Sequence, residues 1–325
     1  MKAVVCREYG PPESLKVEEM PDLEAGPGQA VVNVKACGVN FPDTLIIQGK
    51  YQFQPPFPFS PGGEVSGIVS AIGDGVTNVK VGDLVIASTG WGGFAEQVVA
   101  QADKLITVPG DTDPVMAAGF IMTYGTSHHA LKDRAEIQPG ETLLVLGAAG
   151  GVGIAAVDLG KAMGATVIAA ASTDEKLQVC KEYGADHLIN YETEDLKAKV
   201  KEITGGKGVD VIYDPVGDRF AEPALRSIGW KGRYLVVGFA AGEIPKIPLN
   251  LALLKGCQIC GVFWGRFTGE EPERNQENID ELVSWMAEGK IKPLVSKTYP
   301  FEQAPQAIQD LMDRKAKGKI CLVTD

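Results

Sequence analysis

The sequence predicts an α/β protein in which a β-rich domain is combined with a doubly wound parallel sheet. Short apolar segments broken by Gly and Pro fill the chain from Met1 to about Pro109, and apolar strands alternate with amphipathic helices from Gly140 onward. The length of 325 residues usually exceeds a single compact core. We therefore expect two domains.

The first 109 residues are typical of a compact β domain. AVVNVKACGVN and DLVIAS are expected strands, and GDGV (Gly73–Val76) and GWGGF (Gly90–Phe94) have the composition of turns. No internal repeat or low-complexity tract interrupts this pattern. The expected outcome is a small barrel-like arrangement of strands.

From Gly140 the alternation of strands and helices implies a parallel sheet covered by helices on both faces. The expected strands are TLLVLG, ATVIAA, DHLINY, VDVIYD, RYLVVG and QICGVFWG. After about Phe263 the pattern gives a helix, NIDELVSWMAEG, and a last strand, KICLVTD. We predict that residues 1–118 and 264–325 form the β-rich domain and that residues 119–263 form the parallel-sheet domain.

The residues GAAGGVG, between an expected strand and an expected helix, indicate a dinucleotide-binding turn. Ala148, Gly150 and Gly153 fit the pattern A-x-G-x-x-G, in which the glycines allow close approach of a pyrophosphate and tight helix packing. The helix start, with Gly151 and Val152, offers free N–H groups and a favourable dipole to the phosphates. The alternative is a glycine-rich turn without a ligand.

The end of the second expected strand favours NADPH over NADH. An NAD site normally has an acid there for the ribose 2′-hydroxyl, but residues 167–173 contain none. Small Ser172 and basic Lys176 flank the expected place of a 2′-phosphate, and Tyr191 could border it at the end of the next strand. The alternative for Lys176 is a solvated helix residue.

Asp174 follows the same strand slightly too late for a ribose ligand. Ser172 and Glu175 fit a capping box, and an acid in the first helical turn is favoured by the dipole. We therefore expect Asp174 to serve the helix start rather than a cofactor.

Seven segments carry a resemblance to a known family. They are AGPGQAVVNVKACGVNFPDTLIIQGKYQ, PGGEVSGIV, GGFAEQVV, GAAGGVG, GADHLINY, VDVIYDPVG and GKI near the end. Over nearly its full length the chain resembles the medium-chain dehydrogenase/reductase superfamily, most sharply the quinone oxidoreductase branch related to zeta-crystallin. The resemblance implies a GroES-like β-rich catalytic domain and a Rossmann domain.

The resemblance also implies that no metal is bound. In zinc-containing relatives the position of Asn40 is a cysteine ligand, that of Gly63 is a histidine, and the third ligand falls near Ala118. The closely spaced cysteines of a structural zinc site are missing as well. Cys37 is expected to be a small core residue rather than a ligand.

Without a metal, a conjugated hydride acceptor is the expected substrate, because it delocalises the incoming charge. The neutral amide of Asn40 could donate to the acceptor oxygen or hold the nicotinamide carboxamide, with Asp43 as its support. Tyr51 resembles a tyrosine of the substrate pocket, and Leu45 replaces a second one.

Three further residues are placed near the cofactor by the resemblance alone. Thr123 resembles a threonine that lies near the nicotinamide in relatives, and Phe239 resembles a residue that flanks the nicotinamide end. Arg314 resembles an arginine that reaches the 2′-phosphate. For Tyr51, Thr123 and Phe239 the alternative is ordinary packing.

The sequence therefore predicts a zinc-independent NADPH:quinone oxidoreductase. One alternative is an NADPH-dependent reductase of an activated C=C bond, in an enone or an enoyl or acrylyl thioester. A second is a non-enzymatic NADPH-binding protein, crystallin-like or RNA-binding, although the formal net charge of −11 opposes nucleic acid and anionic membranes.

The sequence also leads to expectations about cellular location and oligomeric state. No signal-peptide segment or membrane-spanning run is evident, and six scattered cysteines do not form a secreted disulfide framework, so we expect a cytoplasmic protein. The strand QICGVFWG would end the parallel sheet with an exposed edge. Pairing of that edge with its twin predicts a homodimer.

Overall fold

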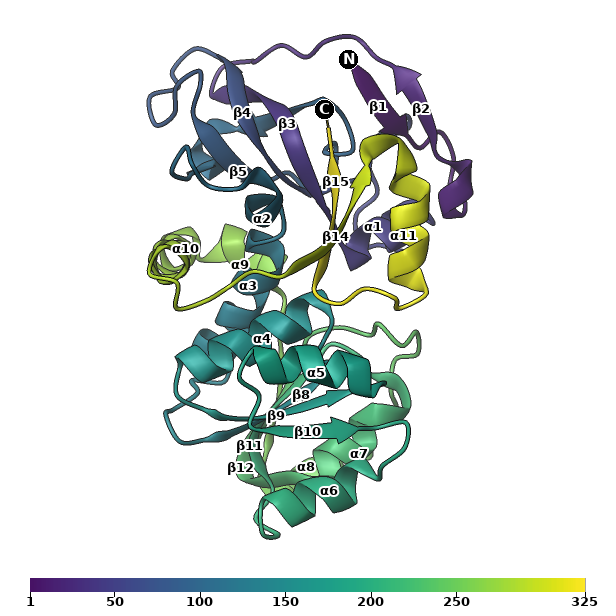
Figure 1. Cartoon of the computed structure of the whole chain (residues 1–325), viewed down its shortest axis with the longest axis vertical. Coiled ribbons are helices and arrows are strands. Elements are labelled where there is room, and N and C mark those ends of the chain that lie inside the picture. Colours follow the sequence, from purple (N-terminus) through teal and green to yellow (C-terminus); the bar gives the residue numbers. More distant parts are fainter. Residues whose placement is uncertain (325) are drawn as a thin grey trace. The chain divides into compact units, whose positions relative to one another are not determined.

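The computed structural model describes residues 1–324, which belong to two compact units. The first unit contains Met1–Met122 and the chain from Leu294 onward, so it is built from both ends of the sequence (Figure 1). The second unit contains Thr123–Pro293. Helices α9 (Trp264–Glu270) and α10 (Pro272–Ala287), which sequence analysis placed with the β-rich domain, belong to the second unit.

The first unit is rich in strands and has three α-helices of its own among the described residues. The strands are β1 (Lys2–Val5), β2 (Lys16–Glu19), β3 (Gln29–Val39), β4 (Glu64–Ile72), β5 (Leu84–Ser88), β6 (Gln97–Gln101), β7 (Ile106–Thr107), β14 (Val295–Pro300) and β15 (Lys319–Val323). The helices are α1 (Phe41–Ile46), α2 (Pro114–Ala118) and α11 (Ala304–Met312).

The main sheet of the first unit has the order β14-β15-β3-β4-β5-β7, with β6 also paired to β3, and β1 pairs with β2 alone. The long strand β3 is antiparallel to both β15 and β4. Ile320 lies opposite Val39 in the first pairing, and Gly38 lies opposite Glu64 in the second. This register brings the starts of β4 and β15 to the end of β3.

The second unit alternates strands and helices. Its strands are β8 (Thr142–Leu146), β9 (Thr166–Ala171), β10 (His187–Asn190), β11 (Val209–Asp214), β12 (Ile228–Val236) and β13 (Gln258–Gly261). The remaining helices are α3 (Ile121–His128), which crosses the unit boundary, α4 (Gly151–Ala162), α5 (Asp174–Glu182), α6 (Leu196–Ile203), α7 (Ala221–Arg226) and α8 (Asn250–Lys255).

These strands form one parallel sheet in the order β10-β9-β8-β11-β12-β13. Helices α4 and α5 cover one face, and α6, α7 and α8 cover the other (Figure 1). Strands β8 and β9 are buried almost throughout, as expected for parallel strands covered on both sides. This doubly wound arrangement, combined with the β-rich first unit, confirms the predicted fold class.

Candidate active site

The turn after β8 brings bare backbone to the start of α4. Gly147 adopts a left-handed φ of 57°, and the helix begins at Gly151. A Cβ on Gly153 would clash with the carbonyl oxygen of Gly147 and lie 2.9 Å from the Cα of Ala148, so only glycine permits this packing. Ala148 is buried, and its N–H donates to a carbonyl of β9 at 3.0 Å. The predicted turn is therefore tied to the sheet.

The N-terminus of α4 fits the pyrophosphate of a dinucleotide. Its N-cap residue is Gly150, and no side chain caps the helix. The first-turn N–H groups of Gly151, Val152 and Gly153 have no acceptor within the helix, and the dipole favours an anion there. A Cβ on Gly150 would meet only the Gly147 oxygen, at 3.3 Å, so a phosphate can approach this backbone closely.

The three side chains expected near a 2′-phosphate lie together at the ends of β9 and β10. Ser172 follows β9, and Lys176 Nζ lies 3.4 Å from Ser172 Oγ. The N–H of Tyr191 donates to Ala171 O at 3.1 Å, which places Tyr191 beside the same strand end. Its ring packs against Phe220, with centroids 4.3 Å apart. An amine and a hydroxyl thus meet at the strand end that Tyr191 also borders, and together they suit a phosphate ester.

The N-cap of α5 is Thr173, so the predicted capping box on Ser172 is wrong by one residue. Thr173 Oγ1 accepts a hydrogen bond from the N–H of Lys176 at 3.2 Å. Ser172 and Thr173 are both good caps, and only the backbone decides which of them precedes the first helical turn. Asp174 accepts a hydrogen bond from Asn190 Nδ2 at 2.7 Å, so it joins α5 to the end of β10.

Phe239 lies in the segment after β12, against the turn that follows β11. A Cβ on Gly217 in that turn would be 2.9 Å from the Phe239 ring. Asp214 holds the turn: its Oδ1 accepts from the N–H groups of Val216 and Gly217, each at 2.8 Å, and its Oδ2 accepts from the Tyr234 hydroxyl. These residues lie at the carboxyl edge of the parallel sheet, where open α/β sheets bind ligands.

In the first unit, Asn40, Glu64 and Lys319 meet at the end of β3. Lys319 Nζ donates to Asn40 Oδ1 at 2.6 Å, to Glu64 Oε2 at 3.1 Å and to Val39 O at 3.1 Å. Asn40 Nδ2 donates to Glu64 Oε2 at 3.0 Å and to Gly38 O at 3.2 Å. Asn40 is 7% exposed, Lys319 5% and Glu64 not at all. A buried ion pair therefore contacts both ends of the Asn40 amide.

Asp43 supports this segment through backbone contacts, one on each carboxylate oxygen. Oδ2 accepts from the N–H of Asn40 at 2.8 Å, and Oδ1 accepts from the N–H of Gly62 at 3.0 Å. The side chain is buried, and burial raises the pKa of Asp43 to about 6, although both hydrogen bonds favour the charged form.

From the sequence alone, neither Lys319 nor Glu64 is predicted to be a site residue. The available signal was the single lysine that opens the otherwise apolar strand KICLV. A buried lysine normally has a charged or polar partner, but the sequence does not show which residues of the distant β3 and β4 provide it.

Tyr51 is half-buried and packs against the core of the first unit. Its ring meets Phe53 edge to face at 4.9 Å, and Phe53 lies 5.6 Å from Trp91. Burial raises the pKa of the Tyr51 phenol, so the hydroxyl keeps its proton at neutral pH. Within residues 1–324 this hydroxyl has no hydrogen-bond partner. Leu45 lies in α1, the helix that precedes Tyr51 in the chain, and contributes an apolar side chain there.

The predicted site residues are divided between the units. Asn40, Tyr51 and Arg314 belong to the first unit, whereas Thr123, Phe239 and the glycine turn belong to the second. Thr123 is buried within α3. Arg314 is exposed just after α11, with a left-handed φ of 58°.

Known proteins resemble both halves and the whole of this chain. Residues 26–110 match the alcohol dehydrogenase GroES-like domain, and residues 151–288 match the zinc-binding dehydrogenase family. A quinone oxidoreductase-like protein 2 homolog of Nematostella vectensis is 39% identical over 326 residues, covering 99% of this chain and 89% of that protein. The chain belongs to the quinone oxidoreductase branch of the medium-chain dehydrogenase/reductase superfamily.

Solved structures of this superfamily are similar over the full length. Escherichia coli quinone oxidoreductase complexed with NADPH is 32% identical, covers 100% of both chains and has a TM-score of 0.92. A 2-haloacrylate reductase is 32% identical, also covers 100% of both chains and has a TM-score of 0.86.

The zinc-binding name of one matched family raises the question whether a metal would fit this chain. Among residues 1–324, no group of three His, Cys, Asp or Glu side chains could hold a metal ion. At Gly63, the histidine position of zinc-containing superfamily members, a Cβ would lie 2.9 Å from Gly90 O. At Asn40, the cysteine position, the Lys319 amine lies 2.6 Å from the amide oxygen. These residues do not fit a zinc ion.

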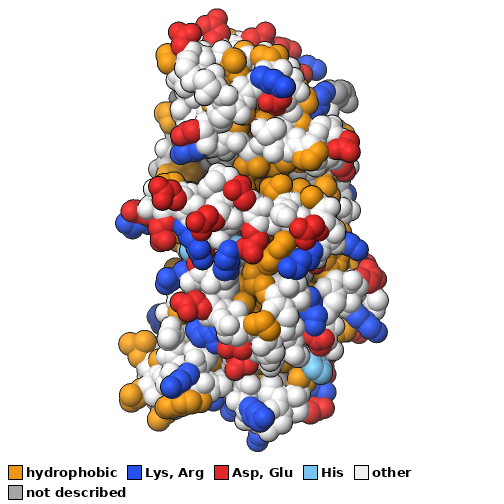
Figure 2. All heavy atoms as spheres, turned by 90° about the vertical axis from the view of Figure 1, so that its left-hand side faces the viewer, with side chains coloured by type: hydrophobic (Ala, Val, Ile, Leu, Met, Phe, Trp, Pro, Cys, Tyr) orange, Lys and Arg blue, Asp and Glu red, His pale blue; other side chains and the backbone are white. Residues whose placement is uncertain are grey.

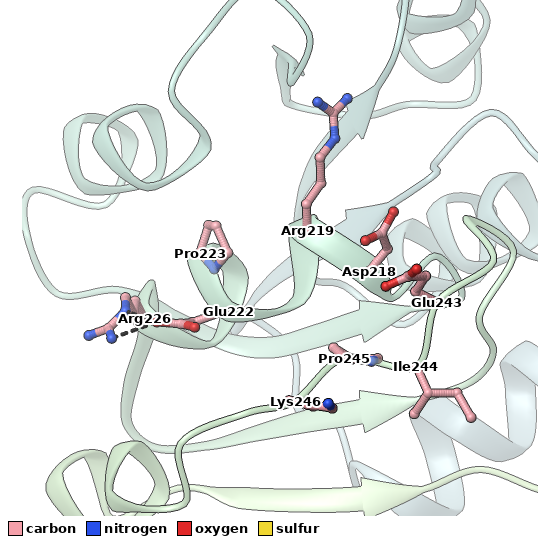
Figure 3. A pocket seen from close by; sticks show the side chains of 9 residues that line it. All are labelled: Asp218, Arg219, Glu222, Pro223, Arg226, Glu243, Ile244, Pro245 and Lys246. Atoms are coloured by element: carbon pink, nitrogen blue, oxygen red, sulfur yellow. Dashed lines mark hydrogen bonds and ion pairs between the residues drawn. The ribbon is translucent and has the colours of Figure 1, made fainter.

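A separate hollow of about 560 Å³ opens on the second unit of this superfamily member (Figure 3). It is lined by Asp218, Arg219, Glu222, Pro223, Arg226, Glu243, Ile244, Pro245 and Lys246. Its acidic and basic side chains balance, and Arg226 pairs with Glu222 at 2.6 Å, so no net charge selects an ion. None of the predicted site residues lines it.

The raised pKa of Asp43 makes a prediction about stability. Between its ordinary pKa of 3.8 and about 6, the folded protein binds more protons than the unfolded chain, so stability falls as pH rises through that window. At 1.36 kcal/mol per pKa unit, the full loss attributable to Asp43 is about 3 kcal/mol. Urea unfolding of wild type and Asp43→Asn from about pH 4 to 7 measures this loss of stability. Only the wild type has the titrating Asp43 carboxyl, so only its stability should fall by this amount.

The control is Asp103→Asn, which removes an exposed carboxylate from the same unit. Its difference from wild type should change little over the same pH range. A wild-type minus Asp43→Asn difference that is constant with pH would contradict the prediction.

Proposed function

We propose that the chain is a zinc-independent NADPH:quinone oxidoreductase that transfers hydride from the nicotinamide to a quinone or a similar conjugated acceptor. The observation that carries the proposal is Asn40, a neutral amide fixed between a buried ammonium and a buried carboxylate where zinc-containing relatives have a metal ligand. The quinone oxidoreductase names of similar proteins support it.

A conjugated acceptor suits the groups that this chain provides. Because residues 1–324 contain no set of metal ligands, they supply neutral hydrogen-bonding groups rather than a site for a Lewis acid. A quinone or an enone spreads the incoming negative charge onto a distant oxygen, so positioning and one neutral donor are sufficient. The Tyr51 hydroxyl, protonated and without a partner among residues 1–324, is such a donor.

The cofactor is NADPH, which supplies the hydride when bound. The first turn of α4 would hold the pyrophosphate, and Phe239 would pack at the nicotinamide end. Ser172, Lys176 and Tyr191 would hold the 2′-phosphate, and the resemblance to relatives makes Arg314 a further candidate for this role. The absence of an acid in residues 167–173 favours NADPH over NADH.

Reduction of an activated C=C bond is the second candidate. The similarity to a 2-haloacrylate reductase favours it, since that protein's name describes a conjugated acid as substrate. The same hydride chemistry would serve an enone or an enoyl thioester, whose carbonyl oxygen receives the charge.

We also propose a homodimer formed through β13, the edge strand of the parallel sheet. Its backbone pairs with β12 on one side only. Beside it, Leu253 and Leu254 of α8 and Trp230 of β12 are each more than half exposed. An uncovered edge with apolar neighbours is suited to a second copy of the same chain, which would cover both at a two-fold axis.

A cytoplasmic protein without nucleic acid or membrane partners is consistent with the charge. No helix within residues 1–324 is long and apolar enough to cross a membrane. Acidic and basic side chains are interspersed on the face in Figure 2, and the formal net charge is −11. Both features disfavour attraction to polyanions.

The first test compares acceptors in a buffer that contains a chelator. NADPH oxidation with a naphthoquinone, unaffected by the chelator, is the expected result. Turnover only with an enone or a crotonyl thioester would transfer the assignment to C=C reduction. Loss of quinone turnover in the chelator would contradict the zinc-independent mechanism.

Lys176→Ala tests the cofactor preference. The variant should lose roughly tenfold or more in NADPH affinity, about 1.4 kcal/mol, while NADH affinity changes little, because only NADPH carries the 2′-phosphate. Titration of cofactor fluorescence measures both. Lys181→Ala, on the same helix, is the control. Equal losses for the two cofactors would show that Lys176 does not bind the phosphate.

The dimer is tested by sedimentation equilibrium at micromolar concentration. The wild type should be a dimer, and Leu253→Asp should be a monomer because it places a charge in the apolar contact. Val81→Asp, which introduces the same charge at an exposed valine of the first unit, should remain a dimer. A monomeric wild type would refute the interface.

A further inference from the structure

The hydrogen-bonding capacity of Asn40 is almost completely used inside the first unit. A carboxamide has two N–H groups and two acceptor positions on its oxygen. Both N–H groups are used, by Glu64 and by the Gly38 carbonyl, and one acceptor position is used by Lys319. The amide cannot be turned round, because an ammonium only donates and a carboxylate only accepts. The Asp43 N–H donates to the backbone oxygen of Asn40, and no side-chain hydrogen bond caps α1, so one lone pair of Asn40 Oδ1 has no donor among residues 1–324.

The ion pair that fixes this amide is itself fully satisfied. The three N–H groups of Lys319 have three acceptors. Glu64 Oε1 accepts from the N–H of Met122 at 2.8 Å, while Oε2 accepts from both Lys319 and Asn40. Burying two charges is costly, and apolar side chains often stabilise a core equally well. Stability therefore does not explain why a lysine is buried here. The orientation that Lys319 gives to the Asn40 amide does explain it.

The backbone leaves room for this arrangement at Gly38. A Cβ there would lie 2.7 Å from Glu64 Oε2 and 3.0 Å from Lys319 Nζ, and it would clash with the carbonyl of Ala118. Any larger residue would push the ion pair away from Asn40. The absence of a side chain at Gly38 thus allows Lys319 and Glu64 to contact Asn40.

We propose that Lys319 and Glu64 are positioning residues for hydride transfer, which hold Asn40 so that it accepts a hydrogen bond from the bound ligand and cannot donate one. This inference rests on the proposed function and narrows it. The ligand group that meets Asn40 is an N–H or O–H, not a quinone or enone oxygen. The hydrogen bond to that oxygen comes from another donor, and the Tyr51 hydroxyl has the free proton for it.

Two variants separate positioning from simple structural support. Lys319→Met removes the donor to Asn40 Oδ1 but leaves a buried carboxylate. The double variant Lys319→Met/Glu64→Gln removes both charges. The N–H of Met122 still donates to the oxygen of the new Gln side chain, so the N–H₂ group of that Gln faces Asn40. Because an N–H₂ group only donates, the Asn40 amide turns round to accept from it. Lys35→Met, on the exposed side of β3, is the control.

The readout that does not depend on turnover is the exchange of the Asn40 Nδ2 protons with solvent. It is followed by NMR of the full chain with ¹⁵N-labelled asparagine and no cofactor, with Asn40→Ala to identify the signal. We expect exchange at least about tenfold faster in Lys319→Met than in wild type, because the amide loses its fixed orientation. Lys35→Met should match wild type. Equal rates in Lys319→Met and wild type would overturn the proposal.

The kinetic arm compares kcat, KM for NADPH and the urea midpoint. Lys319→Met should lower kcat by about tenfold or more, with KM for NADPH changed less than about threefold. The double variant should regain stability while kcat stays low. If kcat recovers together with stability, Lys319 and Glu64 are only structural. A wild type that is inactive with every acceptor would refute the proposed function, and the exchange result would still decide the orientation of Asn40.

Discussion

The pairing of β15 with β3 is the contact on which the first unit depends. It joins segments almost the whole chain apart, with Ile320 opposite Val39 and Leu322 opposite Cys37. Without it β14 and β15 would not be joined to the rest of the main sheet, and Lys319 would not reach Asn40. The position of one cation within the site therefore follows from the register of two strands. A slip by one residue would turn that side chain to the opposite face.

The two units present different kinds of chemical group at their candidate ligand sites. The second unit presents backbone: a helix start, small residues and a turn in which glycine is required by close packing. The first unit presents side chains that are fixed by buried charge and by the carboxylate of Asp43. Backbone recognition suits the constant phosphates of a dinucleotide, whereas side chains can be exchanged to suit an acceptor. The departures from zinc-containing relatives accordingly fall in the first unit.

The fold was predictable because its signals are local. The hydrophobic periods of β8 to β12 and the glycines after β8 lie within short stretches of sequence, and the structure confirms them as strands and a helix start. The α5 cap was misplaced by one residue because Ser172 and Thr173 are chemically alike. Lys319 escaped notice for a different reason: its partner Asn40 is 279 residues away, and no local pattern records a contact at that range.

The discontinuous first unit also sets an order of events during synthesis. Residues 123–293 emerge from the ribosome as one uninterrupted stretch and can fold before the chain is finished, as domains generally do. Residues 36–39 of β3, made much earlier, must wait for β15. A product that lacks β15 would thus retain a folded second unit but would lack the lysine that contacts Asn40. Assembly of the first unit therefore requires translation to proceed through β15.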